Sequence, residues 1–194
     1  MILSNVSIHK AIDNGWLTIE PEPSPRTPSN GDPECPYNTS AVDLRLGREI
    51  AWFRDDMAFS IDLKQGDFRR LFAQNSVLRK LDDDQPFQLR PQRLVLGKTL
   101  EKVTLPIIDD GTCLAARVEG KSSYSRCGLL VHFTAPTIHS GFSGTITLEL
   151  INLGTIPILL HPEIPICQLI IEQVDGVPIR RDSQFQGQST VHGA

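Results

Sequence analysis

The chain has 194 residues, a formal net charge of −4 at pH 7 and a pI near 5.7. This length favours one domain, spanning residues 1–194, with a sizeable hydrophobic core. The mild acidity gives no general attraction for a polyanion, which argues against a protein that binds duplex nucleic acid. No apolar run approaches the length of a membrane span, and residues 1–5 lack the pattern of a secretion signal. We therefore expect a cytoplasmic protein.

The first forty residues predict a helix followed by a loop. Ser4 or Asn5 can cap a helix over residues 4–15, and Gly15 can end it. Residues 20–39 are rich in proline, which fixes φ and removes backbone donors, so this stretch is expected to be a loop. Residues 40–47 then alternate polar and apolar side chains and continue into residues 50–53, which predicts a strand with one solvated face.

The remainder of the chain predicts mostly short strands. Apolar residues at helical spacing between Asp67 and Asp83 indicate a second short helix, with a break near Asn75-Ser76. After Phe87, β-like runs separated by turn residues predict a barrel or jelly-roll. These runs cover residues 93–96, 100–105, 129–134, 145–152, 156–160 and 166–174. The last ten residues are polar and contain glycine, and taken alone they have the composition of a disordered tail.

The cysteines and one histidine motif bear on metal binding. The cysteines at positions 35, 113, 127 and 167 are irregularly spaced, without a Cys-x-x-Cys pair, so we expect free, mostly buried thiols. His161-Pro162-Glu163 matches part of the zinc site of nucleobase deaminases, but no Pro-Cys-x-x-Cys completes it. We therefore expect turn residues here and no catalytic zinc.

The most informative stretch covers residues 117–149. Gly120-Lys121-Ser122-Ser123 offers a flexible backbone, a cation and two hydroxyls, and Arg126 adds a second cation. Such charge-assisted donors suit phosphate oxygens, although the spacing is not that of a P-loop. The alternative is a solvated turn.

Glu149 is the candidate acid–base residue. Period-two geometry over residues 145–150 places it with Thr145 and Thr147 on one face of a strand, opposite Leu148. If that face closes over a cavity, burial is expected to raise the pKa of Glu149 toward neutrality and allow proton transfer. A surface or ion-paired glutamate is the alternative.

Taken together, these segments resemble the dCTP deaminase branch of the trimeric dUTPase superfamily. The Glu-Gly-Lys-Ser-Ser-x-x-Arg element, followed by Gly-Phe-x-Gly-x-Ile-Thr-Leu-Glu, is specific to it. The similarity extends over residues 1–4, 40–47, 100–106, 117–149, 166–169 and 183–188.

The resemblance implies a mainly β fold, a β-clip or distorted jelly-roll of the dUTPase-like type, with two short helices. It also implies a homotrimer whose active sites lie between subunits and are closed by the tail at residues 183–194. The implied reaction is zinc-independent hydrolytic loss of the 4-amino group of dCTP, yielding dUTP and ammonia for deoxynucleotide synthesis. Mg²⁺ accompanies the triphosphate as its counter-ion.

The resemblance also assigns the catalytic residues. Glu149 matches the glutamate that takes a proton from the attacking water, protonates N3 and later helps ammonia leave. Ser122 and Arg126 match residues that place the water and the base beside this carboxylate. The carbonyl of Ala135 matches a further contact to the water.

The remaining matches concern substrate binding. Lys121 and Ser123 match phosphate contacts, and Gln188 matches a tail contact to the triphosphate. Thr147, Leu148 and Gln168 match positions that line the base and the sugar.

Some positions depart from the family pattern. His139 stands where an aspartate usually contacts the sugar 3′-hydroxyl, and in related dUTPases this aspartate supports pyrophosphate release. Gln184 replaces a common lysine and Val177 lies near a usual tyrosine, which predicts weaker triphosphate binding.

Two alternatives therefore stand beside a dUTP-forming deaminase. One is a bifunctional enzyme that forms dUMP, which the residues at 119–123, 141–144 and Gln168 resemble more closely. The other is a non-catalytic nucleotide-binding relative.

Overall fold

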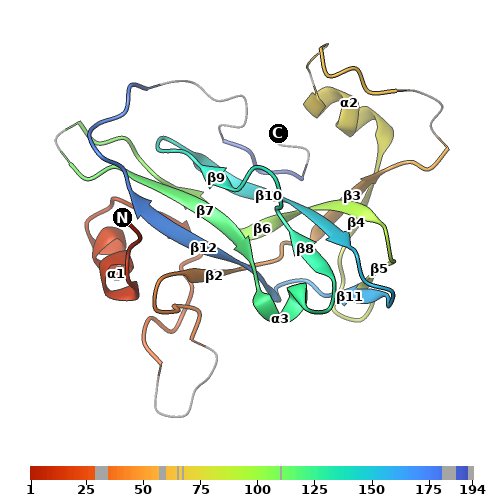
Figure 1. The fold of residues 1–194 in the computed structure, drawn as a ribbon, viewed down its shortest axis with the longest axis horizontal. Helices are drawn as coiled ribbons and strands as arrows, with labels where there is room; N and C mark the ends of the chain where they lie inside the picture. Colours follow the sequence, from red (N-terminus) through yellow and green to blue (C-terminus); the bar gives the residue numbers. More distant parts are fainter. Residues whose placement is uncertain are drawn as a thin grey trace.

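The computed structural model describes residues 1–28, 35–56, 60–64, 66, 68–109, 111–180 and 187–191. Antiparallel sheets make up most of this part of the chain, as the sequence predicted (Figure 1). The larger sheet contains, side by side, Ser76–Lys80 (β4), Glu49–Phe53 (β3), Leu94–Thr104 (β6), Ser143–Asn152 (β10) and Leu129–Val131 (β8), and Thr18–Glu20 (β1) also pairs with β6. A second sheet contains Val42–Arg45 (β2), Pro165–Gln173 (β12), Leu114–Gly120 (β7) and Thr137–Ile138 (β9), and a small one pairs Ile158–Leu160 (β11) with Phe87–Leu89 (β5).

The two main sheets enclose one hydrophobic core. Side chains alternate between buried and more exposed along β6 and β10, because successive residues of a strand point to opposite faces. Leu44, Leu114, Leu148 and Leu169, from four different strands, all belong to the core and are fully buried. The core is therefore built from both sheets.

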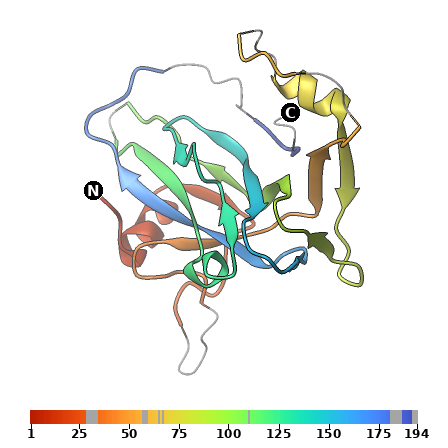
Figure 2. The same ribbon diagram turned by 45° about the vertical axis from the view of Figure 1, so that its right-hand side comes forward.

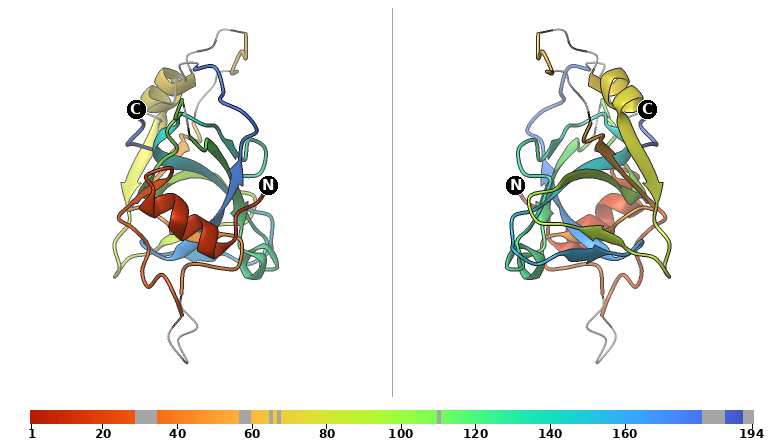
Figure 3. Two further views of the ribbon diagram at one scale, coloured as in Figure 1. Left: turned by 90° about the vertical axis from the view of Figure 1, so that its left-hand side faces the viewer. Right: turned by 90° about the vertical axis from the view of Figure 1, so that its right-hand side faces the viewer.

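The first helix, Asn5–Asp13 (α1), confirms the prediction for residues 4–15. The Ser4 hydroxyl accepts a hydrogen bond from the Ser7 amide and caps the helix, whereas Ile8 and Ala11 are buried. Arg26 then holds the following loop to α1 by pairing with Asp13 at 2.7 Å. The helix lies at the opposite end of the molecule from α2 (Phe68–Asn75) (Figures 1 and 3).

The continuous strand predicted from residue 40 to residue 53 is wrong in one respect. β2 and β3 belong to different sheets, and Leu46 makes an isolated bridge to Thr99 where the chain passes between them. The side chains of Asp43 and Arg45 nevertheless share one face of β2, as the alternation predicted.

The predicted second helix is confirmed only in its first half. α2 ends at Asn75, where the sequence indicated a break, and β4 follows at once and pairs with β3. Figure 2 shows α2 and β4 at the edge of the molecule, and Val77 and Leu78 of β4 are exposed. Apolar residues recur at helical spacing through residues 67–83 of the sequence, but Ser76–Lys80 of this segment form an edge strand instead of a helix.

A short helix that the sequence did not predict, Ser122–Ser125 (α3), lies beside β8 (Figures 1 and 2). Its first main-chain bonds run from the amides of Tyr124 and Ser125 to the carbonyl of Lys121. The predicted turn at residues 120–123 is thus the start of a helix.

The cysteines are unpaired. Cys113 and Cys167 are buried, Cys35 is half-buried and Cys127 is exposed, so the expectation of buried thiols is confirmed for two of the four. Burial, together with the nearby carboxylates of Glu101 and Asp43, raises the pKa of the Cys167 thiol.

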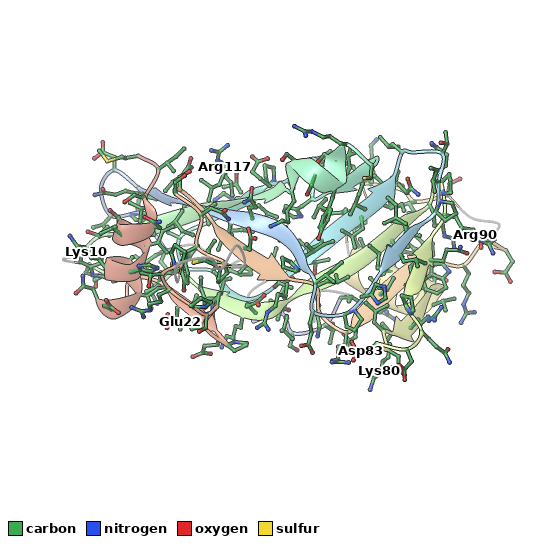
Figure 4. All side chains as sticks on the ribbon, turned by 90° about the horizontal axis from the view of Figure 1, so that it is seen from below. Lys10, Glu22, Lys80, Asp83, Arg90 and Arg117 are labelled. Atoms are coloured by element: carbon green, nitrogen blue, oxygen red, sulfur yellow. The ribbon has the colours of Figure 1, made fainter. Side chains whose placement is uncertain are left out.

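Charged side chains of both signs lie at both ends of the molecule. Figure 4 shows Lys10 and Glu22 at the end that carries α1, and Lys80, Asp83 and Arg90 at the other end. No described helix has the length and the apolar character that a membrane crossing requires.

Candidate active site

The polar face of β10 carries the predicted acid–base residue. As the alternation predicted, Ile146, Leu148 and Leu150 are buried in the core, while Thr145, Thr147 and Glu149 face the other way. The Thr147 hydroxyl is buried and lacks a hydrogen-bond partner in the described structure. Buried polar atoms are rarely left unpaired, so this face has the chemistry of a site that receives water or a ligand.

Glu149 is in contact with a histidine that the sequence did not single out. β8 pairs with the last residues of β10, and directly after β8 the His132 amide donates a hydrogen bond to the Glu149 carbonyl over 2.8 Å. On the same side of the sheet, His132 Nδ1 lies 2.8 Å from Glu149 Oε2. Both atoms are without a hydrogen-bond partner in the described part of the chain. The contact is an ion pair when the ring is protonated.

The environment of Glu149 does not raise its pKa, so the expectation of a near-neutral pKa is wrong. Burial acts to raise the pKa of Glu149, but the contact with His132 and the charge of that ring outweigh it, and the pKa lies below its ordinary value. The carboxylate is therefore ionised at neutral pH. This is the form that can accept a proton from water.

The predicted partners of Glu149 on α3 lie elsewhere on the chain. Ser122, Ser123 and Arg126 are exposed. Their side chains form no hydrogen bond or ion pair with any described residue, and none of them contacts Glu149. A single chain thus presents an acidic surface on β10 and, separately, a surface of hydroxyls and a guanidinium on α3.

Two predicted binding residues meet at a third residue, Asp43. Lys121 Nζ pairs with Asp43 Oδ2, and Gln168 Nε2 donates to Asp43 Oδ1 over 3.2 Å. Asn38 Nδ2 donates to the same Oδ1 over 2.9 Å. These contacts arise because Gln168 of β12 lies opposite Asp43 of β2 and opposite Glu119, just before Lys121. The predicted phosphate-binding lysine is therefore neutralised by a carboxylate in the free chain.

The described end of the tail, residues 187–191, packs against the beginning of β10. The Gly187 amide donates to the Ser143 carbonyl, and the Thr145 amide donates to the Gln188 carbonyl over 3.0 Å. The Gln188 side chain returns a bond from Nε2 to the Thr145 carbonyl over 2.6 Å. Gln188 is thus buried and bound to its own chain, instead of being exposed as expected of a disordered segment.

The other predicted site residues occupy varied positions. Ala135 and His139 are exposed, in the loop before and the turn after β9. The Leu148 side chain is fully buried in the core, and its backbone lies opposite Gly97 of β6. Its place beside the base and the sugar stays a prediction. Gln184 lies outside the described residues.

Sequence reasoning missed His132 and the role of Asp43. The outward orientation of Asp43 followed from the alternation of β2, but its lysine partner lies 78 positions away. His132 carried no local signal, because its relation to Glu149 depends on the pairing of β8 with β10. Within the described ranges, no group of three or more His, Cys, Asp or Glu side chains is placed to hold a metal ion.

Comparisons with known proteins agree with these features. A family model described as dCTP deaminase-like matches residues 2–174. The chain is 40% identical over 169 residues to a protein of Dictyoglomus thermophilum named dCTP deaminase, dUMP-forming, covering 87% of this chain and 78% of that protein. It is 36% identical over 194 residues to a protein of the same name from Methanothermobacter thermautotrophicus, covering 97% and 90% of the two chains.

A solved structure shows the same fold. The crystal structure of 2′-deoxycytidine 5′-triphosphate deaminase from Agrobacterium tumefaciens has a TM-score of 0.60 at 18% sequence identity. The match covers 90% of this chain and 48% of that one, so this chain spans about half the length of that neighbour. The predicted dUTPase-like β fold is confirmed. Because the family model spans most of the chain and relatives above 30% identity match nearly all of it, the chain belongs to the dCTP deaminase-like family.

Proposed function

We propose that the protein deaminates dCTP by hydrolysis and then cleaves the resulting triphosphate to dUMP and pyrophosphate. The observation that carries this proposal is the polar face of β10, where an ionised carboxylate at Glu149 lies on the same face as the unpaired Thr147 hydroxyl. A pure binding protein has no evident need for a half-buried carboxylate held against a buried imidazole. Hydrolytic deamination requires such a base.

The residues suit the first reaction as follows. The Glu149 carboxylate takes a proton from a water that adds to C4 of the cytosine ring, and it passes a proton to N3. The C4–N bond then breaks, ammonia leaves, and the ring becomes uracil. Ser122 and Arg126 supply the hydroxyl and cation that hold the water and the base, and Lys121 and Ser123 bind phosphate oxygens.

The final product distinguishes a deaminase that stops at dUTP from a bifunctional enzyme that forms dUMP. From the sequence, we expected dUTP as the final product, with dUMP as the alternative. The two curated relatives described above are both named as dUMP-forming, which supports dUMP as the final product. A second water attacks the α-phosphorus, the bond between the α- and β-phosphates breaks, and dUMP and pyrophosphate are released. Mg²⁺ would accompany the triphosphate as its counter-ion. His139 would then contact the sugar with an imidazole where a carboxylate is usual.

The exposure of α3 supports an assembly in which the site is shared between chains. Ser122 and Arg126 are solvent-exposed and do not reach Glu149 of the same chain. A homotrimer in which α3 of one subunit faces β10 of the next would unite the two surfaces. The trimer is thus part of the proposal.

The test is to incubate the protein with dCTP and Mg²⁺ and to follow nucleotides, ammonia and pyrophosphate. We expect dUMP, ammonia and pyrophosphate in equal amounts, and turnover should persist when a zinc chelator is added before Mg²⁺. Accumulation of dUTP without pyrophosphate would instead indicate a deaminase whose final product is dUTP. Tight binding of dCTP without any product would indicate a nucleotide-binding relative.

Glu149→Gln is the matching variant, because it keeps the shape of the side chain and removes the base. We expect turnover to fall by about a hundredfold to ten-thousandfold. Glu20→Gln is its control, since Glu20 is an exposed carboxylate at the end of β1. Near-normal turnover of Glu149→Gln would contradict the assignment.

A further inference from the structure

His132 is the most constrained polar residue outside the predicted site. Its side chain is only 7% exposed, and both ring nitrogens are without a hydrogen-bond partner among the described residues. Burying an imidazole in this way is unfavourable unless its polar atoms are used. Nδ1 of the ring lies beside Glu149 Oε2, and Nε2 is buried without a hydrogen-bond partner among the described residues.

The backbone of His132 is also unusual. Its φ is +53°, in the left-handed region that few residues other than glycine adopt, although asparagine, aspartate and histidine are found there more often than the rest. The conformation occurs directly after β8, where the His132 amide still bonds to the Glu149 carbonyl. The fold therefore maintains a less favourable backbone conformation at the residue whose ring contacts the catalytic carboxylate.

Glu149 is the charged group that faces the His132 ring in the described structure. β8 itself, Leu129–Val131, has no titratable side chain, and β10 contributes Glu149. α3 packs beside β8 and carries Arg126 at its C-cap, but Arg126 is exposed and forms no ion pair with a described residue. The electrostatic environment of the carboxylate oxygen is thus dominated by one imidazole.

We infer that His132 is a positioning residue for the deamination, which fixes the orientation of the Glu149 carboxylate and keeps it ionised between turnovers. The inference rests on the proposed function, because it gives Glu149 the role of general base. A base that must accept a proton in each cycle needs to return to its charged form and to one orientation. A buried imidazole 2.8 Å away meets both needs.

The test uses His132→Asn and His132→Gly. Asparagine and glycine both tolerate the left-handed backbone, so neither variant adds strain, and neither can carry the positive charge. Gln92→Asn is the matched control, because Gln92 is exposed and has a φ of +59°. For dCTP turnover we expect both His132 variants to lose up to about a hundredfold in kcat with a smaller change in KM. The acid limb of the pH–rate profile should move to higher pH, because the Glu149 carboxyl loses the imidazole that lowers its pKa.

A direct titration separates this inference from the proposed function. The protein is labelled with glutamate carrying ¹³C at the carboxyl group, and the Glu149 signal is assigned by its loss in Glu149→Gln. In the free wild-type protein the signal should titrate below the ordinary glutamate pKa of about 4.3, and in both His132 variants it should titrate above the wild-type value. This measurement needs no turnover, so it decides the role of His132 even if dCTP is not a substrate.

The outcomes are distinct. An unchanged Glu149 titration and an unchanged acid limb in both variants, with Gln92→Asn behaving as wild type, would overturn the inference. If the wild type shows no turnover but the titration moves as expected, the contact between the two residues stands and the proposed reaction fails. If one variant does not fold, the other carries the same measurement.

Discussion

At the scale of single residues, Glu101 shows how the fold is held together near the site. It is fully buried on β6, and its two carboxylate oxygens accept from the Arg45 amide over 2.8 Å and from Arg45 Nε over 2.6 Å. Its carbonyl accepts from Thr99 Oγ1, which in turn accepts from the Ile146 amide. This network connects β2 to β6 and β6 to β10. The position of β10 therefore depends on a buried carboxylate far from the chemistry.

Glu101→Gln should destabilise the protein strongly. The amide oxygen cannot replace a carboxylate that accepts two bonds from Arg45, and because the Arg45 side chain is 35% exposed and stays partly hydrated, the expected loss is that of a hydrogen bond to a charged group, about 1.5–3 kcal/mol. Urea unfolding should show this as a lower free energy of unfolding with an unchanged m-value. Glu163→Gln is the control, because its pair with Arg48 is exposed on both sides and exposed ion pairs contribute little to stability. Equal effects of the two substitutions would contradict this interpretation.

The same scale explains what the sequence could reveal about the site. Glu149 and Thr147 could be assigned to one face because strand alternation depends only on neighbouring residues. The ionised state of Glu149 could not, because burial and His132 act in opposite directions and His132 reaches it only by strand pairing. The pairing of Lys121 with Asp43 likewise joins residues that are distant along the chain.

At the scale of elements, β10 has two functional ends. Glu149 lies toward its end at Asn152, and the tail is bound at its beginning by Ser143 and Thr145. Four residues of strand separate Thr145 from Glu149, which is about 13 Å. Lys98 of β6 also donates to the Ser189 carbonyl, so the described tail contacts both strands. Any movement of the tail is therefore coupled to the strand that carries Glu149, the proposed catalytic carboxylate.

Gly144→Ala should release the tail. A Cβ at this position would lie 2.9 Å from the Gln188 carbonyl oxygen, which is closer than real Cβ atoms come, and 3.1 Å from its amide nitrogen, which is tighter than nine in ten such contacts. Gly144 is paired with Val103 of β6 on one side and has the tail on the other, so the tail is the part that can move. Hydrogen exchange followed by mass spectrometry should show faster exchange in the peptide containing residues 187–191, with little change in β10.

Gln188→Ala is the companion variant. It removes one side-chain bond, from Nε2 to the Thr145 carbonyl, and adds no bulk. Its effect on tail exchange should be smaller than that of Gly144→Ala. If tail exchange in Gly144→Ala equals that of the wild type, the tail is not held by close packing at Gly144.

Element prediction from the sequence succeeded where the pattern is long and failed where it is short. α1 and β10 were found because a capped apolar stripe and a long alternation are both local signals. β7 was missed because Ala115 and Ala116 interrupt its alternation, although pairing with β12 still makes it a strand. α3 is too short for a periodic signal and depends on its packing beside β8.

At the scale of the whole molecule, the proposed trimer makes a specific prediction for mixed subunits. If Glu149 of one chain works with Arg126 of another, Glu149→Gln and Arg126→Ala are each inactive alone, but they complement each other within one trimer. Random mixing gives roughly a quarter of interfaces with both residues intact in a cyclic assembly. After co-refolding, we expect roughly that fraction of wild-type turnover.

Sedimentation of the wild type is the companion measurement, and it should give three times the 21.5 kDa chain mass. Each single variant should sediment as the wild type does, since Glu149 and Arg126 are not part of the core. A monomer, or mixed trimers without any recovered activity, would place the whole site within one chain. The outcome therefore shows whether Glu149 works with Arg126 of its own chain or of another chain.

The Lys121–Asp43 pair has a consequence for how the free protein meets its ligand. The lysine that is expected to hold a phosphate is already paired with an anion that belongs to the fold, and Gln168 and Asn38 keep that anion in place. Capture of a triphosphate by Lys121 is thus an exchange of one negative partner for another. Such an exchange gains only the difference between two attractions. Recognition then depends less on total charge than on whether the whole nucleotide fits, which disfavours inorganic phosphate and other small anions as competitors.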